Sequence, residues 1–299
     1  MQPFSDWPPA QVFLTAAWCQ AIQWVVFIHA AAFNTEKFFD LTGSLTYISA
    51  TVGGLFYAEY RRTSGGHGSL PAARQFIVSG MVLVWALRLG SFLFWRIMSD
   101  GKDGRFDDIK PNKARFFNVW VIQGLWVFLT AAPVFCLNSV VDANPPLCAS
   151  DFIGWAVWLA GFALEAVADH QKTVWRANPA NKGRYITVGL WGWSRHPNYL
   201  GEITLWFGVF IACSRAFATP GNYTMFTSVI SPFFVALLIC KLSGIPKLEE
   251  NADAKWGHEE AYLQYKARTP VLLLRLPRCG TPPALDDTGS AKKQLVAEP

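Results

Sequence analysis

Four charged side chains recur at helical spacing in one stretch of the chain. Glu165, Asp169, Lys172 and Arg176 are separated by four, three and four residues, so a helix would place them on one face. Two acids therefore precede two bases along one stripe. This order suits a ligand with a hydrogen-bonding head deep in the protein and phosphates nearer the water. A solvated helix end with its own ion pairs would give the same stripe.

A second polar group lies at the predicted start of the next helix. The tetrapeptide His196–Tyr199 contains Pro197, which favours the first helical position because its missing N–H has no partner there in any case. The open backbone N–H groups of such a helix start, with Arg195 and His196 beside them, would bind a phosphate or a carboxylate. Many helices begin with proline after a loop, but few bring Arg, His, Asn and Tyr together in five residues.

These residues carry a resemblance to a known family. The segment WGWSRHPNYLGE, residues 191–202, resembles the signature of membrane sterol reductases and of the wider steroid 5-alpha-reductase-like family, and QKTVWRANP, residues 171–179, resembles the segment that precedes it in sterol reductases. The likeness is specific over residues 165–276, about a third of the chain. Residues 83–108 more loosely resemble an uncharacterised branch of the family. The segment YKARTPVLLL, residues 265–274, resembles the closing segment of both the reductases and the isoprenylcysteine methyltransferases.

The resemblance implies an NADPH-dependent reductase of a carbon–carbon double bond in a membrane lipid, such as a steroid, a sterol, an isoprenoid or an enoyl-type compound. Within it, Lys172 and Arg176 would hold the adenosine phosphates. The residues of the stripe and the positions aligned with the family together form the predicted cofactor site: Glu165, Asp169, Lys172, Arg176, Trp191, Arg195, His196, Asn198, Tyr199, Glu202, Tyr262 and Tyr265.

The chain departs from the family pattern at two places. Leu93 lies three residues before Arg96, where steroid 5-alpha-reductases have a tyrosine. Glu249 is the nearest match to the arginine and aspartate that sterol reductases place after the last span. These departures affect the identity of the substrate more than the binding of the cofactor.

The reduction also needs a proton donor. A hydride must lie about 3 to 3.5 Å from the accepting carbon, and a group at the other end of the conjugated system must donate a proton or a hydrogen bond. Tyr47 and Asp40 lie on a polar stripe of a predicted span, and Arg88 lies inside an apolar one, where a cation is costly and marks a functional candidate. Hydroxyl groups that bond to neighbouring helices, and an arginine that extends to the membrane surface, are the structural alternatives.

Two other functions fit part of the pattern. The RHP motif, a following acidic residue and a terminal Y-x-x-x-x-P also occur in S-adenosylmethionine-dependent isoprenylcysteine and phospholipid methyltransferases. The basic pair Lys172 and Arg176 favours the reductase, because the 2′-phosphate of NADPH explains it and S-adenosylmethionine does not. A sterol-binding or scaffold protein that has lost catalysis is the third hypothesis.

Composition predicts an all-α, polytopic membrane helix bundle. The 299 residues are 52% hydrophobic and only 16% charged, with a mean hydropathy of +0.22. A net charge of +5 without a basic, aromatic-rich soluble module argues against a nucleic-acid partner. The six cysteines are scattered without metal-ligand spacing, so neither a metal site nor a disulfide framework is predicted. No G-x-G-x-x-G follows a predicted strand, so a nucleotide would lie between helices.

Seven apolar runs have about the length needed to cross a bilayer. The predicted spans are 11–33, 41–60, 75–97, 117–137, 152–168, 197–217 and 225–242. Asn178-Pro179 should end the helix that carries the charged stripe, and residues 247–266 predict a short cytoplasmic helix. We therefore expect one transmembrane reductase-like domain over 1–276, with its cofactor-binding part at 165–276, and a disordered tail at 277–299.

The distribution of basic residues predicts the orientation. The loops that share a side with the N-terminus hold four basic residues: Arg61, Arg62, Arg74 and Arg215. The opposite loops hold eleven: Lys37, Lys102, Arg105, Lys110, Lys113, Arg115, Lys172, Arg176, Lys182, Arg184 and Arg195. The positive-inside rule places the N-terminus outside or in the lumen and the C-terminus in the cytoplasm. The membrane would be that of the endoplasmic reticulum in a eukaryote and otherwise the inner membrane.

Overall fold

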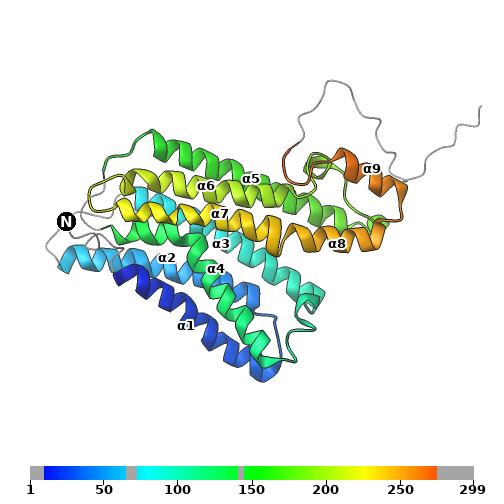
Figure 1. Ribbon diagram of the computed structural model, residues 1–299, viewed down its shortest axis with the longest axis horizontal. Helices are drawn as coiled ribbons and strands as arrows, with labels where there is room; N and C mark the ends of the chain where they lie inside the picture. Colours follow the sequence, from blue (N-terminus) through cyan, green and yellow to red (C-terminus); the bar gives the residue numbers. More distant parts are fainter. Residues whose placement is uncertain (1–9, 65–72, 141–144, 275–299) are drawn as a thin grey trace, which may run out of the picture. The chain divides into compact units, whose positions relative to one another are not determined.

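The computed structural model describes residues 10–64, 73–140 and 145–274, and all regular structure in these ranges is helical (Figure 1). The predicted fold class is therefore confirmed. In chain order the helices are α1 (Ala10–Phe33), α2 (Phe39–Ser64), α3 (Ala73–Asp100), α4 (Lys113–Ser139), α5 (Ala149–Ala177), α6 (Pro197–Phe217), α7 (Ile230–Leu237), α8 (Ile245–Trp256) and α9 (Glu260–Arg268). Short 3-10 turns and one π turn, Leu238–Leu242, join some of them.

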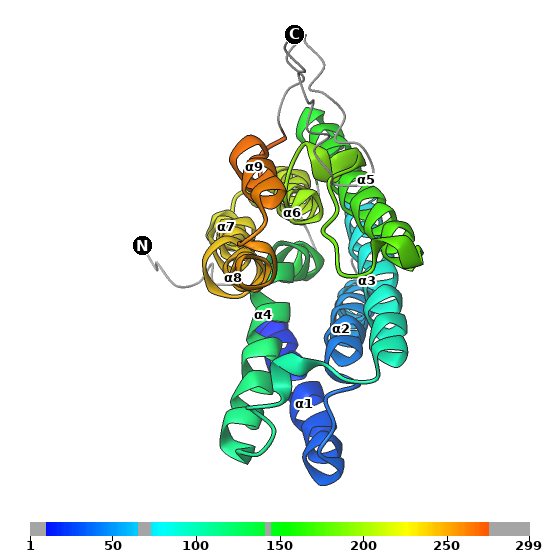
Figure 2. The ribbon, with the colours of Figure 1, turned by 90° about the vertical axis from the view of Figure 1, so that its right-hand side faces the viewer.

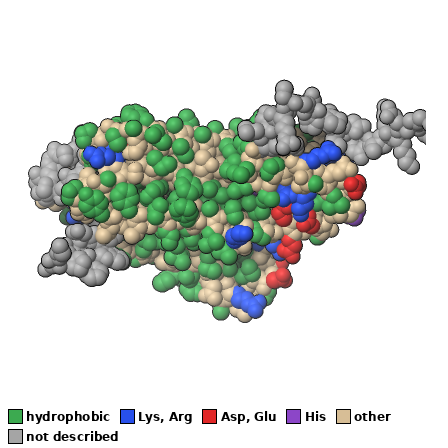
Figure 3. Space-filling view, turned by 45° about the horizontal axis from the view of Figure 1, so that its top comes forward, with side chains coloured by type: hydrophobic (Ala, Val, Ile, Leu, Met, Phe, Trp, Pro, Cys, Tyr) green, Lys and Arg blue, Asp and Glu red, His purple; other side chains and the backbone are tan. Residues whose placement is uncertain are grey.

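Six described helical segments are long and apolar enough to cross a membrane, so the chain is a multi-pass integral membrane protein. They are α1, α3, α4, α5, α6 and the run Tyr223–Trp256 that contains α7 and α8. Hydrophobic side chains cover most of the helix surface visible in Figure 3. The predicted span 41–60 does form a helix, α2, but it is not among the six. Its Gly, Ser, Thr and Asp residues make it more polar than the other spans.

The described residues form two compact units. Unit 1 contains the residues up to Ala163 together with Gly201–Leu238, and unit 2 contains Leu164–Leu200 together with the residues from Ile239 onward. Within unit 1, α1 packs against α4 and α2, and α2 packs against α3 (Figures 1 and 2).

Buried amides join the helices of unit 1. Gln11 Nε2 donates to the backbone oxygens of Gly54 and Asn138, at 3.0 and 3.1 Å. Gln75 Nε2 donates to the carbonyls of Leu137 and Val140 at the end of α4. In hydrocarbon no water can satisfy these groups, so such side chains hold one helix to the next.

Three glycines bring the backbones of α5 and α6 into contact within unit 1. A Cβ on Gly154 would lie 2.5 Å from the backbone N of Ala212, and one on Gly161 would lie 2.5 Å from that of Leu205. A Cβ on Gly208 would likewise meet the backbone of α5. Only residues without a side chain permit so close an approach.

A buried ion pair joins α3 and α5 in unit 1. Arg74 Nε and Nη2 donate to the two carboxylate oxygens of Asp151, at 2.5 and 2.8 Å, and both side chains are fully buried. The remaining donors of Arg74 reach the carbonyls of Pro145 and Pro146, and the N–H of Cys148 donates to Asp151. Arg74, which the topology count placed in a loop, is thus a helical residue with a fixed partner.

The local signals in unit 2 act as predicted at two helix ends. Helix α5 ends at Ala177, before Asn178-Pro179, and α6 begins at Pro197. The single helix predicted over 247–266 is wrong: α8 ends at Trp256 and α9 begins at Glu260. The N–H of Gly257 closes α8, and Glu259 is extended, so the chain turns between the helices. The predicted tail, 277–299, lies outside the described residues.

Candidate functional site

The charged stripe of α5 passes from buried to exposed along the helix. Glu165 and Asp169 are only 2% and 8% exposed, Lys172 is half-buried, and Arg176 is exposed. The acids thus lie in the interior of unit 2 and the bases lie nearer its surface. This gradient matches a ligand whose polar head is buried and whose phosphates are close to water.

Trp191 is fixed against this stripe from three sides. Its Nε1 donates to the carbonyl of Ala168 at 2.9 Å, and its backbone oxygen accepts a hydrogen bond from the hydroxyl of Tyr265 at 2.7 Å. The ammonium of Lys172 lies 4.3 Å from the centre of the indole ring, within the range of a cation–π interaction. The preceding turn requires Gly189, whose φ of 61° is in the left-handed region.

The start of α6 meets the same stripe. Asn198 Nδ2 donates to Asp169 Oδ1 at 3.1 Å. The two preceding residues contact α8: His196 Nε2 lies 2.8 Å from Glu249 Oε1, and Arg195 Nη2 lies 3.2 Å from Glu249 Oε2. Residues from α5, α6 and α8 therefore come together within unit 2.

Three polar atoms in this cluster are buried and have no hydrogen-bond partner among the described residues. They are Arg195 Nε, His196 Nδ1 and Asn198 Oδ1. Each such atom costs about 1 to 3 kcal/mol when it is left without a partner, and native structures contain few of them. Tyr199 stacks on the imidazole of His196, with ring centres 5.7 Å apart. Arg195 Nε is a donor and Asn198 Oδ1 is an acceptor, and Nδ1 of a neutral His196 whose Nε2 donates to Glu249 is a second acceptor, so the three atoms suit a neutral, hydrogen-bonding group.

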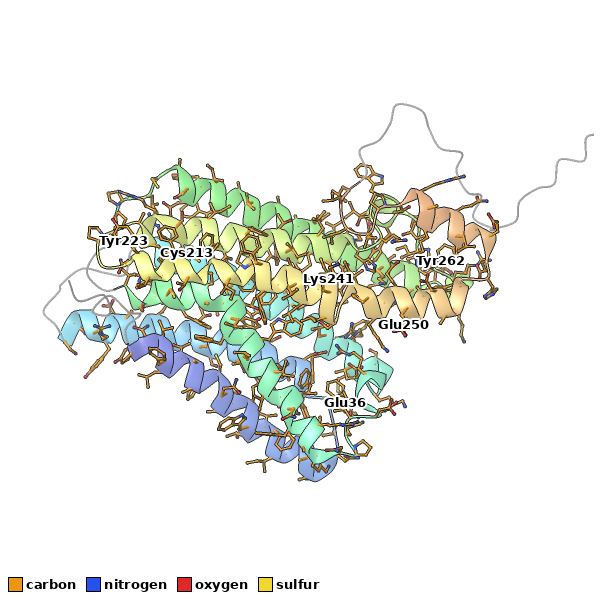
Figure 4. All side chains as sticks on the ribbon, in the orientation of Figure 1. Glu36, Cys213, Tyr223, Lys241, Glu250 and Tyr262 are labelled. Atoms are coloured by element: carbon orange, nitrogen blue, oxygen red, sulfur yellow. The ribbon has the colours of Figure 1, made fainter. Side chains whose placement is uncertain are left out.

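The tyrosines of α9 close one side of unit 2. Tyr262, labelled in Figure 4, is 3% exposed, and its hydroxyl donates to Asp253 Oδ1 at 3.0 Å. Burial raises the pKa of Tyr262, and its hydrogen bond to Asp253 raises it further. Tyr185 packs between Tyr262 and Tyr265, with ring centres 5.1 and 5.7 Å away. The phenols therefore remain protonated donors near neutral pH.

Three residues of this cluster were not predicted as site residues: Glu249, Asp253 and Lys266. Lys266 Nζ lies 3.4 Å from Glu249 Oε2 and 2.5 Å from Asp253 Oδ1. Glu249 and Asp253 are four residues apart on α8, so their shared face could have been recognised. Their partner His196 could not, because it is 53 residues from Glu249 in the sequence.

The predicted proton donors lie in unit 1, as does Glu202. Tyr47 is buried, with its ring 5.0 Å from that of Trp85 and 6.1 Å from that of Trp206. Arg88 lies over the ring of Phe92 at 5.7 Å.

Asp40, the third predicted donor, belongs to an ion-pair cluster at the start of α2. Its Oδ2 lies 3.8 Å from Arg96 and 3.4 Å from Arg105. Asp40 is therefore paired with two guanidinium groups, whereas Tyr47 packs among aromatic rings.

Comparison with known proteins places the chain in a family. A family model described as "Protein of unknown function (DUF1295)" matches residues 26–269. An uncharacterized protein of Schizosaccharomyces pombe is 27% identical over 129 residues, which cover 37% of this chain and 37% of that protein. No solved structure matches the chain.

Two further relatives have names that describe an activity. A probable O-methyltransferase of Ustilaginoidea virens is 38% identical over 64 residues, 21% of each protein. A delta(14)-sterol reductase of Mus musculus is 27% identical over 127 residues, which cover 38% of this chain and 28% of the reductase. The chain thus spans less than two fifths of the length of each of these relatives. The similarity to sterol reductases is distant and partial.

Proposed function

The chain belongs to the DUF1295 family, and from that premise we propose that it is a membrane-embedded, NADPH-dependent reductase of a carbon–carbon double bond in a lipid. One observation carries the proposal. Three buried polar atoms without partners, on Arg195, His196 and Asn198, lie in the same unit as the stripe that ends in Lys172 and Arg176. The distant similarity to a delta(14)-sterol reductase supports the class of reaction.

The donor set fits the parts of this nucleotide. Its hydrogen-bonding head would bind the unpartnered polar atoms of Arg195, His196 and Asn198. Its phosphates would bind the two basic side chains of α5, Lys172 and Arg176. NADPH, when bound, supplies a hydride to the double bond. The 2′-phosphate gains charge-assisted hydrogen bonds from Lys172 and Arg176 that a 2′-hydroxyl cannot use. Trp191 holds Lys172 in place through its ring.

Cofactor titration of the detergent-purified protein tests the assignment. Arg176→Ala should weaken NADPH binding by about 1.5 to 3 kcal/mol, because a hydrogen bond to a charged group is lost, and should weaken NADH binding much less. Lys182→Ala, which removes another exposed base of unit 2, is the matched control and should leave both affinities unchanged. Equal losses for NADPH and NADH in Arg176→Ala would remove this assignment.

On the lipid side, we assign proton donation to Tyr47, with Arg88 to stabilise developing negative charge. Along α2, Tyr47 lies about 9 Å from Leu41, and along α3, Arg88 lies about 13 Å from Ile97, at 1.5 Å per residue. Tyr47→Phe should lower turnover by about 10²- to 10⁴-fold while NADPH affinity stays the same. Arg88→Leu should damage both. If Tyr47→Phe turned over a known substrate at the rate of the wild type, Tyr47 would not be the proton donor, and Asp40 would be the next residue to test.

The second candidate is an S-adenosylmethionine-dependent methyltransferase acting on a lipid or an isoprenylcysteine. The short match to a probable O-methyltransferase favours it. S-adenosylmethionine has no phosphate to use the basic pair of α5. Binding of S-adenosylmethionine without binding of NADPH in the same titration would therefore select the methyltransferase.

The proposed orientation supports a cytoplasmic cofactor site, with the N-terminus in the lumen or outside. Arg74 is paired inside the bundle, so the loops on the N-terminal side retain three of their four counted bases, Arg61, Arg62 and Arg215, against eleven opposite. With α2 counted as the second of seven spans, as the sequence predicts, the positive-inside rule keeps the N-terminus in the lumen or outside. The endoplasmic reticulum, or the inner membrane of a bacterium, is the proposed location.

A further inference from the structure

A short non-helical segment after α9, with bends at residues 271–273, is hydrogen-bonded to the residues that precede α6. The N–H of Arg195 donates to the carbonyl of Pro270 at 2.9 Å. Ser194 Oγ donates to the carbonyl of Leu272 at 2.9 Å and is 3.4 Å from that of Val271. Both segments belong to unit 2. The backbone at 270–272 is therefore fixed beside the polar cluster of 195–198.

The outer side of this junction is apolar. Leu273 is 69% exposed and Trp193 is 48% exposed, and Val271 and Leu274 are also exposed. Trp193 directly precedes Ser194, the residue whose hydroxyl is bonded to the segment. We call Trp193 together with Val271–Leu274 the strap surface. Its side chains carry no charge, and the exposed Arg268 lies just before it at the end of α9.

We propose that the strap surface lies in the headgroup and acyl boundary of the membrane, as a contact additional to the spanning helices. The proposal does not depend on which reaction the protein catalyses. Exposed large apolar side chains that occur together indicate a binding surface. Tryptophan beside aliphatic side chains, with a cation at the edge, is the composition of an interfacial anchor.

Three features of unit 2 select lipid as the occupant. The unit continues from the bilayer through α5, one of the six candidate membrane spans, on which Val167 is exposed. A non-helical segment lacks the internal backbone hydrogen bonds of a helix, so it does not cross the hydrocarbon exposed to lipid, and the boundary region is the depth it can occupy. The positive charge of Arg268 complements anionic headgroups. A second copy of the chain, or residues 275–299, would be the other occupants.

Spin labels on the full chain in nanodiscs of phosphatidylcholine and phosphatidylglycerol test the proposal. A label at Leu273→Cys reports its depth through the ratio of its collisions with oxygen, which concentrates in lipid, to those with a water-soluble nickel chelate. Serine should first replace the partly buried Cys148 and Cys240, together with Cys279, which lies outside the described residues. Cys19, Cys136 and Cys213 are buried and can remain.

Two control positions calibrate the result. Ile28→Cys places a label on an exposed apolar position of α1, and Glu260→Cys places one on the exposed start of α9. We expect the label at Leu273 to favour oxygen over the nickel chelate at least several-fold more than the label at Glu260. Preference for the chelate would show a strap surface in water and would overturn the proposal. Low collision rates with both reagents would show that protein covers it, which would also overturn the proposal.

Discussion

Two clusters of arginine and carboxylate in this protein differ in how completely they are satisfied. In unit 1, Arg74 and Asp151 are fully buried, and each donor group of the guanidinium has a partner. In unit 2, Arg195 also meets a carboxylate, that of Glu249, but its Nε has no partner among the described residues. We call the Arg74 cluster closed, because every donor group of its guanidinium has a partner, and the Arg195 cluster open, because one donor there has none in the part of the chain that the structure describes. A closed pair stabilises a fold, whereas an open one leaves hydrogen-bonding capacity for another molecule.

The difference has a cause in the local chain. The carbonyls of Pro145 and Pro146 accept hydrogen bonds from the guanidinium of Arg74. In the same short loop before α5, the N–H of Cys148 donates to Asp151. At 194–198 the backbone must instead begin a helix, and Pro197 has no N–H to donate. The partners of Arg195 thus come from side chains of α8 and from one carbonyl of α9.

The largest expected effect comes from breaking the closed pair. Asp151→Ala should reduce the free energy of unfolding by about 3 to 5 kcal/mol, because it leaves a buried, unpaired arginine. Thermal unfolding in detergent micelles measures this loss. The double variant Arg74→Met with Asp151→Leu should recover much of it, since no charge remains to be paired. A single variant that melts like the parent would end the distinction between the two clusters.

The open cluster should respond more in binding than in stability. Asn198→Ala should abolish activity and weaken nucleotide binding by about 1 to 3 kcal/mol, while loss of its hydrogen bond to Asp169 should lower the free energy of unfolding by only about 0.5 to 1.5 kcal/mol and leave the protein folded. Asn178→Ala is the matched control, because this asparagine lies beside a proline at a helix start but caps only an exposed 3-10 turn. If Asn198→Ala retained normal binding and activity, the residue would be a helix-start residue only.

The smallest expected effect on stability concerns a third cluster, at Glu36, which is labelled in Figure 4. Glu36 is buried, but its partner Lys110 is partly exposed. Burial disfavours the charged carboxylate, but hydrogen bonds from Lys110 and the Asp103 N–H outweigh it and lower the pKa of Glu36. Because the folded pKa is the lower one, this group stabilises the fold above the ordinary carboxyl range and the contribution is lost as the pH falls through the folded pKa.

Melting temperatures measured from neutral pH down to about pH 4, just below the ordinary glutamate pKa, check this sign. Glu36→Gln should melt lower than the parent at neutral pH, and the difference should shrink as the medium becomes acidic. A difference that grew on acidification would mean that the carboxylate is destabilised by its surroundings.

Local signals made part of this fold predictable. Proline acts on its immediate neighbours, so the end of α5 and the start of α6 could be placed at the correct residues. Hydrophobic length located six of the seven predicted spans, because a bilayer sets that length for every helix, whereas the predicted span 41–60 forms a helix that is not among the candidate spans. The break at Gly257 was missed because a single glycine is compatible with the interior of a helix.

The sequence predicted which site residues share a face of one helix, but it did not predict which helices bring their residues together. The stripe on α5 follows from its spacing, and so does the helix start at Pro197, but the sequence contains no signal that pairs His196 with Glu249. Arg74 and Asp151, 77 residues apart, were likewise not recognised as a pair. Such contacts depend on which helix faces meet, and periodicity does not define that.

The glycine contacts between α5 and α6 also restrict the route by which a lipid could reach the interior. At Gly154, Gly161 and Gly208 the two backbones are so close that a single added carbon would collide with them. An acyl chain or a sterol ring is wider than that carbon, so neither can pass between these helices in unit 1. A lipid that enters unit 1 from the bilayer must therefore pass between a different pair of helices.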